Sequence, residues 1–381
     1  MSLWADKYCP RTLDDLTYHE EISKKLKKLS SSGDFPHLLV YGPSGAGKKT
    51  RVMVLLRELY GSGAEKLKVD VKTFQTPSGR KLEFNVISSP YHLEITPSDM
   101  GNNDRIVIQD LLKDVGQTES IDFAGLLHND DKKIVSNNKK KFKVVVINEA
   151  ELLSRDAQAA LRRTMEKFSA NIRLILVCNS TSSIIDPIKS RTLAVRVGLA
   201  TFKETSDVFQ NILKHEHMAD SSFPEDEVER QASFQKVYES AEGNLRMGIM
   251  MLEALYMNNE HVTCSTAMIR PDWQLVIDEL ARGIIKDRSV GKLQHTRSVL
   301  YELLAHAIPA NLILKRLTLQ LWHDLGEFAA LKNKDETLTK VVDAASTFDE
   351  RLSLGSKDIF HLEGFITRVM VIVEEELNGR T

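Results

Sequence analysis

A glycine-rich segment near the N-terminus constrains the fold more than any other feature of this sequence. The residues from Gly42 to Lys48 read GPSGAGK, and they lie between an apolar run, HLLVY, and a segment with apolar residues at helical spacing, KKTRVMVLLRELYG. Glycines allow backbone N–H groups to turn inward around phosphates, a helix N-terminus adds a positive dipole, and the lysine reaches the β- and γ-phosphates. The segment therefore predicts a strand, a phosphate-binding loop and a helix, in that order.

The stretch from Pro36 to Val197 continues this alternation of strand and helix patterns. Runs that are continuous in apolar residues, such as KFKVVVIN and NIRLILVCN, alternate with helical patterns such as DAQAALRRTMEKF. That order is typical of a parallel sheet covered by helices on both faces, so we expect an α/β nucleotide-binding fold. KLEFNVISSPYHLEITPSD contains two β-rich runs and predicts an inserted hairpin before a helix that begins near Asn103. The polar residues from Gly125 to Lys141 predict a mobile loop.

The remainder of the 381-residue chain is expected to be helical. Short helical patterns, broken by DSSFPEDE and AEGN, occupy residues 201–260 and predict a small helical domain. Residues 271–381 contain longer helical patterns, such as DWQLVIDELARGII and HLEGFITRVMVIVEEEL, and predict a third, all-α domain. The expected fold class is therefore α/β plus all-α.

Charge balance and cysteine usage limit the classes of protein that fit. The chain has 51 Lys and Arg against 53 Asp and Glu, a net charge of -2, which excludes a polybasic nucleic-acid binder and leaves only a local basic face for such contacts. Three cysteines are too few for a disulfide framework, which suits a reducing compartment. The N-terminus lacks a signal-peptide pattern, no stretch is long enough to cross a bilayer, and His215 and His217 have no metal-binding spacing. We expect a cytosolic or nuclear protein.

The phosphate-loop motif departs from its usual pattern directly after Lys48. A Ser or Thr there supplies a hydroxyl to Mg²⁺, but this sequence has Lys49, and Thr50 comes one place later. Because a helix turns by about 100° per residue, Thr50 should point away from the metal. The strand VVVI ends in Asn148 and Glu149, where an Asp that holds Mg²⁺ and a Glu that activates water are expected. An amide is a poorer Mg²⁺ ligand than a carboxylate, so Mg²⁺ binding is in doubt, and Glu149 is either a base or a solvated strand-end residue.

Three further polar residues occupy positions that suit nucleotide chemistry. Asn179 ends the strand LILVC, where an amide senses a γ-phosphate or orients water. Arg191 lies in Ser190-Arg191-Thr192, and Arg246 lies in the GNLR segment of the helical region. A single arginine is most often a solvated surface charge, so neither arginine alone indicates a function.

Together, these residues resemble the AAA+ clamp loaders, and among them a small subunit of eukaryotic replication factor C. The resemblance spans nearly the whole chain and includes LWADKYCP, the phosphate loop, AQAALRRTME and Ser190-Arg191-Thr192. Family members usually have Arg where Cys9 stands, which affects only a local contact. Lys49 and Asn148, with the segments SSPYHLEITPSDMGNNDR and FDERLSLGSKDIFHLEGFI, are similar to the small-subunit type whose own ATPase site is degenerate.

The resemblance implies three domains and a heteromeric machine. The domains are an AAA+ P-loop nucleotide-binding domain at residues 1–200, a helical lid at 201–260 and a helical collar at 271–381 that serves oligomerisation. The implied partners are the other replication factor C subunits of a hetero-pentamer, the sliding clamp PCNA and primer-template DNA, and the implied location is the nucleus. The sequence leaves open whether alternative checkpoint clamp-loader large subunits are also partners.

The residues that the resemblance assigns to ATP or ADP binding flank the adenine, cradle the phosphates or act as sensors. They are Ala5, Tyr8 and Thr17 at the adenine, Gly42, Pro43, Ser44, Gly45, Ala46, Gly47, Lys48, Lys49, Thr50 and Asn148 at the phosphates, and the sensors Asn179 and Arg246. Mg²⁺ is doubtful at this site because its usual ligands are replaced.

The leading functional hypothesis is a regulatory subunit of an ATP-driven clamp loader. By resemblance, Arg191 is an arginine finger that acts in trans on ATP bound next door, while Glu149 is a vestigial base in a site with little turnover. Such a finger contributes roughly 10³ to 10⁵ in rate in GTPases. The alternatives are a self-contained AAA+ ATPase that hydrolyses ATP at its own site with Glu149 as base, and an assembly scaffold that binds no nucleotide.

Contacts with DNA and with the clamp are the least specific expectations. Arg105, Arg162 and Arg163 lie on predicted helices of the first domain and are candidates to contact DNA phosphates. The segment from Gln117 to Phe123, QTESIDF, is an imperfect version of the pattern that sliding clamps bind.

Overall fold

The computed structural model describes residues 2–32, 35–75, 79, 81–117, 142–216, 223–224, 226–259, 261–263, 266–328, 333–355 and 357–378. They fall into two compact units, Met1–Met268 and Ile269–Thr381, and each is described by itself. The predicted mobile loop from Gly125 to Lys141 lies outside the described residues, as does all of the segment from Gln117 to Phe123 except its first residue.

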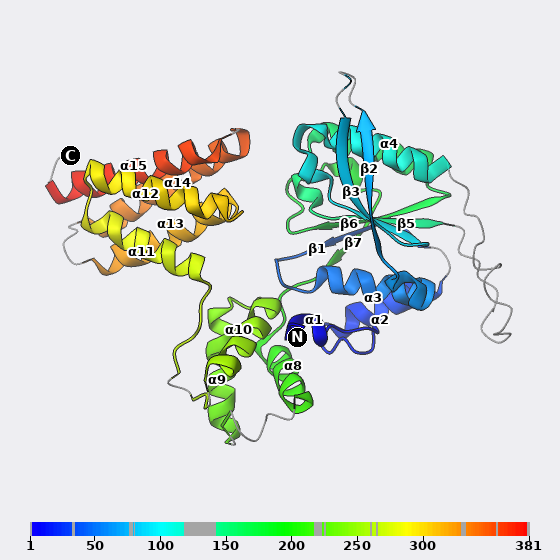
Figure 1. Ribbon diagram of the computed structural model, residues 1–381, viewed down its shortest axis with the longest axis horizontal. Coiled ribbons are helices and arrows are strands. Elements are labelled where there is room, and N and C mark those ends of the chain that lie inside the picture. The colour runs from blue at the N-terminus through cyan, green and yellow to red at the C-terminus, as the bar shows by residue number, and fades with distance from the viewer. Residues whose placement is uncertain are drawn as a thin grey trace. The chain divides into compact units, whose positions relative to one another are not determined.

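Among the described residues of the first unit, seven strands form one sheet (Figure 1). The strands are β1 (Leu38–Tyr41), β2 (Lys68–Gln75), β3 (Lys81–Ser88), β4 (His92–Ile95), β5 (Lys143–Ile147), β6 (Ile172–Cys178) and β7 (Leu193–Arg196). They are arranged in the order β2-β3-β4-β5-β6-β1-β7, and the last five strands in this order are parallel to one another. The expected parallel sheet is thus confirmed, with two antiparallel strands added at one edge.

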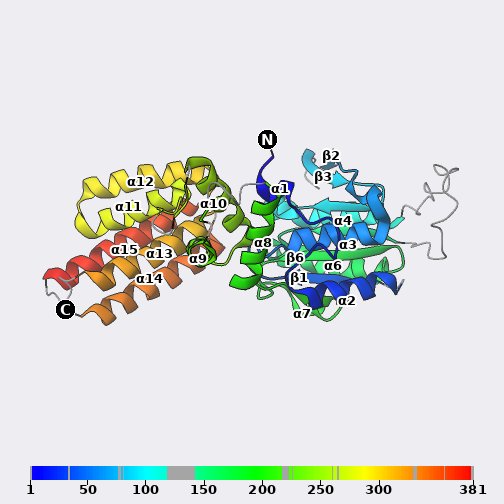
Figure 2. The same ribbon diagram turned by 90° about the horizontal axis from the view of Figure 1, so that it is seen from below.

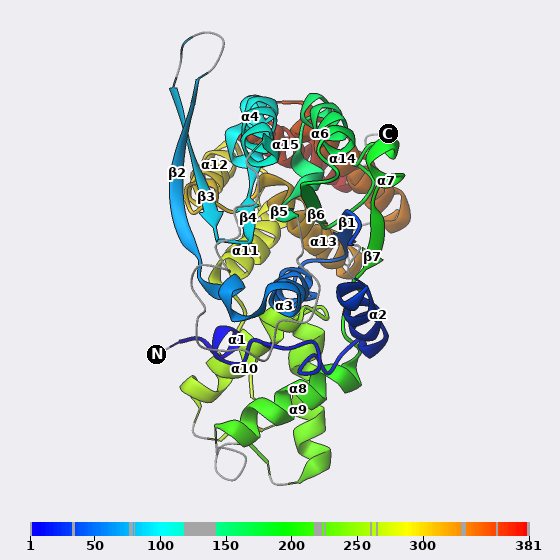
Figure 3. The same cartoon turned by 90° about the vertical axis from the view of Figure 1, so that its right-hand side faces the viewer.

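Helices cover both faces of this sheet. They are α2 (Glu20–Ser31), α3 (Lys48–Tyr60), α4 (Asp104–Gln117), α6 (Arg155–Lys167) and α7 (Asp186–Lys189), with short 3₁₀ segments η1 (Gly61–Glu65), η2 (Pro97–Asn103) and η3 (Ala150–Leu152). The short helix α1 (Trp4–Lys7) packs away from the sheet, on a later helix of this unit. Side chains alternate along a strand, so Leu39 and Val145 pack with α4 and α6, whereas Val40 and Val146 pack with α2 and α3. Figure 3 shows the two pairs of helices on opposite sides of the strands.

This topology decides where the polar loops meet. The carboxyl ends of the parallel strands β1, β4, β5 and β6 lie at one edge of the sheet. The loops that follow them begin at Gly42, Thr96, Asn148 and Asn179. Ligands of open α/β sheets bind at this edge, so these four loops form the expected location of a site.

The predicted hairpin is present, although the sheet extends farther than the sequence indicated. β3 and β4 pair antiparallel, with Ile87 opposite Glu94, and α4 begins at Asp104, one residue after the predicted start. The prediction missed β2, which pairs with β3 along its whole length. Val69 and Val71 of β2 are 70% and 60% exposed, so this edge strand lacks the buried apolar run by which the other strands were recognised.

The first unit also contains the helices α8 (Phe202–His215), α9 (Glu227–Ser240) and α10 (Leu245–Asn258). Local capping explains where they begin. Thr201 and Glu204 form a capping box at the start of α8, and Oδ1 of Asn244 accepts a hydrogen bond from the Met247 N–H at the start of α10. Their division into a separate lid domain stays a prediction, because they lie within one compact unit with the sheet.

The second unit is all-helical, as expected. It comprises α11 (Asp272–Lys286), α12 (Val290–Ala305), α13 (Ala310–Glu327), α14 (Lys334–Leu354) and α15 (Asp358–Asn378). Leu317 and Leu321 of α13 and Phe365 and Val369 of α15 are fully buried in its core, and the helices run side by side in Figure 2. Among the described residues of the chain, no helix combines the length and apolar character that a membrane crossing needs.

Candidate nucleotide-binding site

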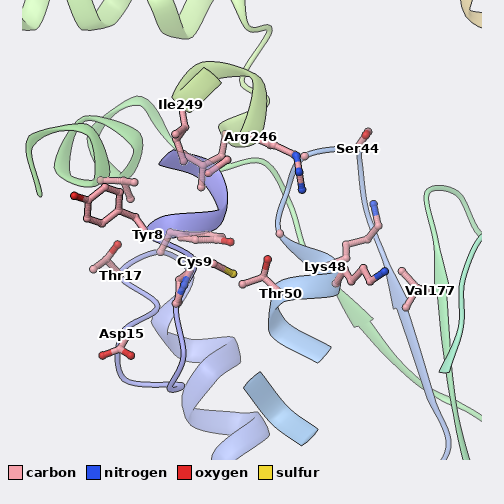
Figure 4. A pocket seen from close by; sticks show the side chains of 18 of the residues that line it. Tyr8, Cys9, Asp15, Thr17, Ser44, Lys48, Thr50, Val177, Arg246 and Ile249 are labelled. Carbon is pink, nitrogen blue, oxygen red and sulfur yellow. The ribbon is translucent and has the colours of Figure 1, made fainter. Parts of the chain in front are cut away.

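A pocket of about 1000 Å³ opens at the carboxyl edge of the sheet in the first unit. Its walls come from the N-terminal segment, the phosphate loop, the ends of β5 and β6, and the helices α8 and α10. Every residue predicted to bind nucleotide lines it except Gly42, Pro43 and Ala46, and Glu149 lines it too. In Figure 4, Tyr8 and Thr17 lie on one side of the pocket and Ser44 and Lys48 on the other. A volume of this size suits a nucleotide.

The backbone of the phosphate loop requires glycine at two positions. Gly45 and Gly47 have φ angles of 75° and 79°, in the left-handed region that other residues rarely adopt. A Cβ atom at Gly45 would lie 1.7 Å from Oδ1 of Asn244, and one at Gly47 would lie 2.0 Å from the Tyr18 hydroxyl oxygen. The loop is therefore closely packed on both sides, and its conformation suits phosphate binding by backbone N–H groups.

Lys48 connects this loop to the end of β6. Its Nζ donates hydrogen bonds to the carbonyl oxygens of Gly42 and Pro43 at 2.7 and 2.8 Å, and to Oδ1 of Asn179 at 2.8 Å. Burial lowers the pKa of the Lys48 ammonium from its ordinary value, and the nearby carboxylate of Glu151 opposes that shift. The predicted phosphate lysine and the predicted sensor are thus in direct contact.

Glu151 holds Asn179 in place, and the sequence analysis did not assign it a role. Its Oε1 accepts hydrogen bonds from the backbone N–H of Asn179 at 3.0 Å and from its side-chain amide at 2.7 Å. This fixes the orientation of the amide, so that Oδ1 points to Lys48. The signal available in the sequence was a second acid two residues after Glu149, at the end of a buried strand.

A buried carboxylate that no motif in the sequence indicated, Glu94, lies against Lys49 and Asn148. The Glu94 side chain on β4 is 4% exposed and forms an ion pair with Lys49, while the Asn148 amide donates to its Oε1 at 2.7 Å. Mg²⁺ prefers an octahedral set of oxygen ligands, whereas Lys49 is a cation and Asn148 presents an N–H to Glu94. The residues present therefore do not fit Mg²⁺. Thr50, the hydroxyl residue nearest to the usual ligand position in the motif, appears between Cys9 and Lys48 in Figure 4.

Glu149 lies at the pocket but makes a contact away from the phosphate loop. It adopts the left-handed conformation, with φ 51° and ψ 43°, which costs a non-glycine residue of order 1 kcal/mol. Its Oε2 accepts a hydrogen bond from the Ser98 hydroxyl at 3.2 Å. The carboxylate is thus held toward the loop that follows β4.

The N-terminal segment is tied to the helices that complete the pocket. The Tyr8 hydroxyl and the Lys7 ammonium donate to Oε1 of Glu216, at 2.6 and 2.5 Å. The backbone N–H of Trp4 donates to Oε2 of Glu253 at 3.0 Å, and the buried Trp4 ring stacks on Tyr256 with 5.5 Å between centroids. These contacts fix the segment that carries Tyr8 against the end of α8 and against α10.

Apolar residues of α8 and α10 complete the pocket, and they too were missed. Val208 and Ile212 of α8 and Leu245 and Ile249 of α10 line the pocket. Each pair has a spacing of four residues, which places its members on one helix face. That pattern was visible in the sequence, but it resembled an ordinary core face. Arg246 forms an ion pair with Asp6, with 3.5 Å between Nη2 and Oδ1, and both side chains are mostly exposed.

Arg191 lies outside the pocket, after α7, and its side chain is 35% exposed. Its Nη2 pairs with Oε1 of Glu166 at 2.7 Å, and its Nη1 donates to the Pro187 carbonyl oxygen at 2.8 Å. Arg162 pairs with the same Glu166 oxygen at 3.4 Å. Arg191 therefore lies at the surface, where its guanidinium is paired with the Glu166 carboxylate of α6.

The three arginines predicted to contact DNA lie on two neighbouring helices. Arg105 is on α4, where it pairs with Asp156 of α6 at 3.8 Å, and Arg162 and Arg163 are on α6. All three are exposed. The buried Asp104 carboxylate accepts hydrogen bonds from the N–H and the hydroxyl of Ser154, and so joins the N-terminal ends of the two helices.

Comparisons with known proteins cover the whole chain. The family model described as "Replication factor C subunit 3, C-terminal domain" matches residues 273–377, and "DNA polymerase III, delta subunit" matches residues 18–200. Replication factor C subunit 5 of Saccharomyces cerevisiae is 50% identical over 380 residues, which cover 98% of this chain and 100% of that protein. Replication factor C subunit 5 of Schizosaccharomyces pombe is 45% identical, covering 97% and 96%.

This chain is also similar over its whole length to an animal protein. Replication factor C subunit 3 of Homo sapiens is 42% identical over 383 residues, covering 100% of this chain and 99% of that protein. Identity of 42% to 50% over nearly the whole length of the aligned sequences implies the same fold and the same kind of subunit. The chain therefore belongs to the replication factor C family of AAA+ clamp-loader small subunits.

Proposed function

We propose that this chain is a regulatory subunit of the clamp loader, which holds ATP or ADP with little turnover and supplies Arg191 to ATP bound by a neighbouring subunit. One observation carries the proposal. The phosphate loop has the glycine conformations and the lysine that nucleotide binding requires, while Lys49 and Asn148 are both committed to Glu94. A site of this kind retains phosphate binding and lacks the metal-assisted step.

The proposed nucleotide site uses the residues of the pocket. Tyr8, Thr17 and Ala5 flank the adenine, the loop from Gly42 to Thr50 binds the phosphates, and the sensors Asn179 and Arg246 complete it. Support comes from the pocket itself, which brings the N-terminal segment, the loop and α10 together around one volume. Asn148 belongs to this set through its contact with Glu94, next to the phosphates.

The proposed assembly rests on the resemblance to the clamp-loader family to which the chain belongs. We place the chain in a hetero-pentamer with the other replication factor C subunits, which opens the sliding clamp PCNA and loads it onto primer-template DNA in the nucleus. Residues 1–200 form the nucleotide-binding domain, 201–260 the lid and 271–381 the collar. Arg105, Arg162 and Arg163 contact DNA phosphates, which agrees with their exposure on adjacent helices.

The Arg191→Ala variant of the assembled complex tests the trans role. Turnover at the neighbouring site should fall by about 10³-fold, because an arginine finger stabilises the charge of the transition state. Nucleotide binding to this chain, measured by equilibrium dialysis, should be unchanged. Arg191→Lys is the matched control: it retains the charge but not the planar fork, so it should recover only a small part of the rate. A DNA-dependent ATPase rate that Arg191→Ala leaves unaffected would exclude the finger assignment.

A second function, hydrolysis at the chain's own site, is favoured by one observation, the presence of Glu149 at the pocket. Single-turnover assays on the isolated chain distinguish the two. Hydrolysis that is abolished by Glu149→Gln would identify a self-contained ATPase. No turnover, together with measurable binding, supports the regulatory subunit.

A further inference from the structure

We propose that the Lys49 ammonium, fixed on the buried carboxylate of Glu94, takes the place of a divalent cation, so that this chain binds adenine nucleotide without Mg²⁺. The inference rests on the proposed function, because it concerns the same pocket. It goes further by naming the group that provides the second positive charge for the phosphates.

The sheet register brings the three residues together. β4 and β5 are parallel, with Glu94 opposite Val146, and the backbone N–H of Asn148 donates to the Ile95 carbonyl oxygen at 2.9 Å, which extends the ladder by one residue. Val146 packs on the face covered by α3, and alternation places Glu94 and Asn148 on that same face. Lys49 lies in the first turn of α3, above them.

Charge balance shows why Lys49 and Asn148 suit each other. A buried carboxylate without a partner is strongly unfavourable, and Glu94, at 4% exposed, is satisfied by one cation and one neutral donor. An aspartate at position 148 would place a second carboxylate beside Glu94, and the two would need a second positive charge. With asparagine at that position, Lys49 and the Asn148 amide satisfy Glu94 without a further cation, and a divalent cation there would face the Lys49 ammonium.

Lys49 remains available to a ligand. Its side chain is 59% exposed and lines the pocket next to Lys48, so the loop offers two ammonium groups at one end of the pocket. A metal ion in a P-loop site neutralises the β- and γ-phosphates and also fixes their geometry. An ammonium provides only the charge, so nucleotide is bound and the geometry for phosphoryl transfer is missing.

The test measures the binding of labelled ADP and ATP to the full chain by equilibrium dialysis, once with Mg²⁺ and once with EDTA. The wild-type chain should bind equally in both. Lys49→Thr should weaken binding in EDTA by about 10-fold or more, since a charge-assisted contact is lost. Lys49→Thr combined with Asn148→Asp should bind in a Mg²⁺-dependent way, tighter with Mg²⁺ by about 10-fold or more. Lys49→Arg should remain independent of Mg²⁺.

Lys68→Thr, on the exposed start of β2, is the control for the loss of one positive charge and should bind as the wild type does. Wild-type binding that requires Mg²⁺ would overturn the inference and leave the proposed nucleotide site intact. Absence of binding in both buffers would overturn the proposed nucleotide site as well. Because the wild-type comparison decides between these outcomes, a variant that fails to fold does not remove the test.

Discussion

The candidate nucleotide pocket and the surface around Arg191 belong to the same unit but differ in the partners of their charged side chains. In the pocket, the loop glycines and Lys48 are arranged for phosphates, while Lys49 and Asn148 are bound to Glu94. At the surface, Arg191 is presented on Glu166, outside the pocket. If the proposed function holds, this difference makes binding a nucleotide and acting on one separable properties, carried by side chains on different elements.

Lys48→Ala is expected to have the largest effect on nucleotide binding, and it tests whether the pocket and the Arg191 surface act separately. The Lys48 ammonium is the most buried cation of the pocket and makes three hydrogen bonds, and loss of a charge-assisted phosphate contact should weaken nucleotide binding by about 100-fold. Turnover at the neighbouring site should stay the same when the complex is assembled, as measured by a DNA-dependent ATPase assay. A parallel loss of both properties would show that pocket and finger are not separable.

Gly45→Ala should produce the next largest effect, on the pocket alone. The new Cβ atom would overlap Asn244, and the φ of 75° adds strain of about 1 kcal/mol, so we expect roughly 10-fold weaker nucleotide binding and a lower melting temperature. Gly79→Ala is the control matched in φ, because its φ is 77° and its Cβ atom would meet nothing within 4 Å. Equal losses in the two variants would mean that strain, and not the contact with Asn244, is responsible.

Glu166→Ala should have a smaller effect, on the surface that carries Arg191 and Arg162 and not on the pocket. The exposed ion pair contributes little to the free energy of unfolding, but it orients Arg191. Turnover at the neighbouring site should therefore fall about threefold. Nucleotide binding and the melting temperature should not change. Glu336→Ala, which removes an exposed ion pair with Lys340 in the second unit, is the control. An unchanged rate in Glu166→Ala would show that Pro187 and the backbone suffice to position Arg191.

The smallest expected effect is a change in thiol labelling that separates two sides of the pocket. Cys9 is exposed on the pocket wall, so bound nucleotide should slow its alkylation several-fold in a Cys264→Ser background. Burial raises the pKa of the Cys178 thiol to about 12, so it should remain unlabelled at neutral pH with or without nucleotide. Mass spectrometry of labelled peptides measures both, and rapid labelling of Cys178 would contradict the closed structure at the end of β6.

Much of the fold could be predicted because its signals are local. The glycine motif, the apolar strands β1, β5 and β6 and the helical patterns each depend on neighbouring residues, and the structure confirms them. β2 was missed because an edge strand with exposed valines has no continuous apolar run. Its pairing with β3 adds one antiparallel strand beyond the predicted hairpin.

The site could be predicted only as a set of motif positions. Glu94 and Asn148 are 54 residues apart and meet only through the register of β4 and β5, so no spacing rule in the sequence joins them. Tyr8 and Glu216 are 208 residues apart, and their contact depends on how α8 packs. Arg191 was recognised from its motif, but its partner Glu166 comes from another helix.

The stacking of Trp4 on Tyr256 gives the molecule an internal optical reporter. Trp4 is 4% exposed and is the one tryptophan of the first unit, since the other two are Trp273 and Trp322. The same short segment carries Tyr8 into the pocket, so a ligand that shifts this segment should alter the fluorescence of Trp4. With Trp273 and Trp322 replaced by phenylalanine, nucleotide exchange becomes measurable in real time without an added dye.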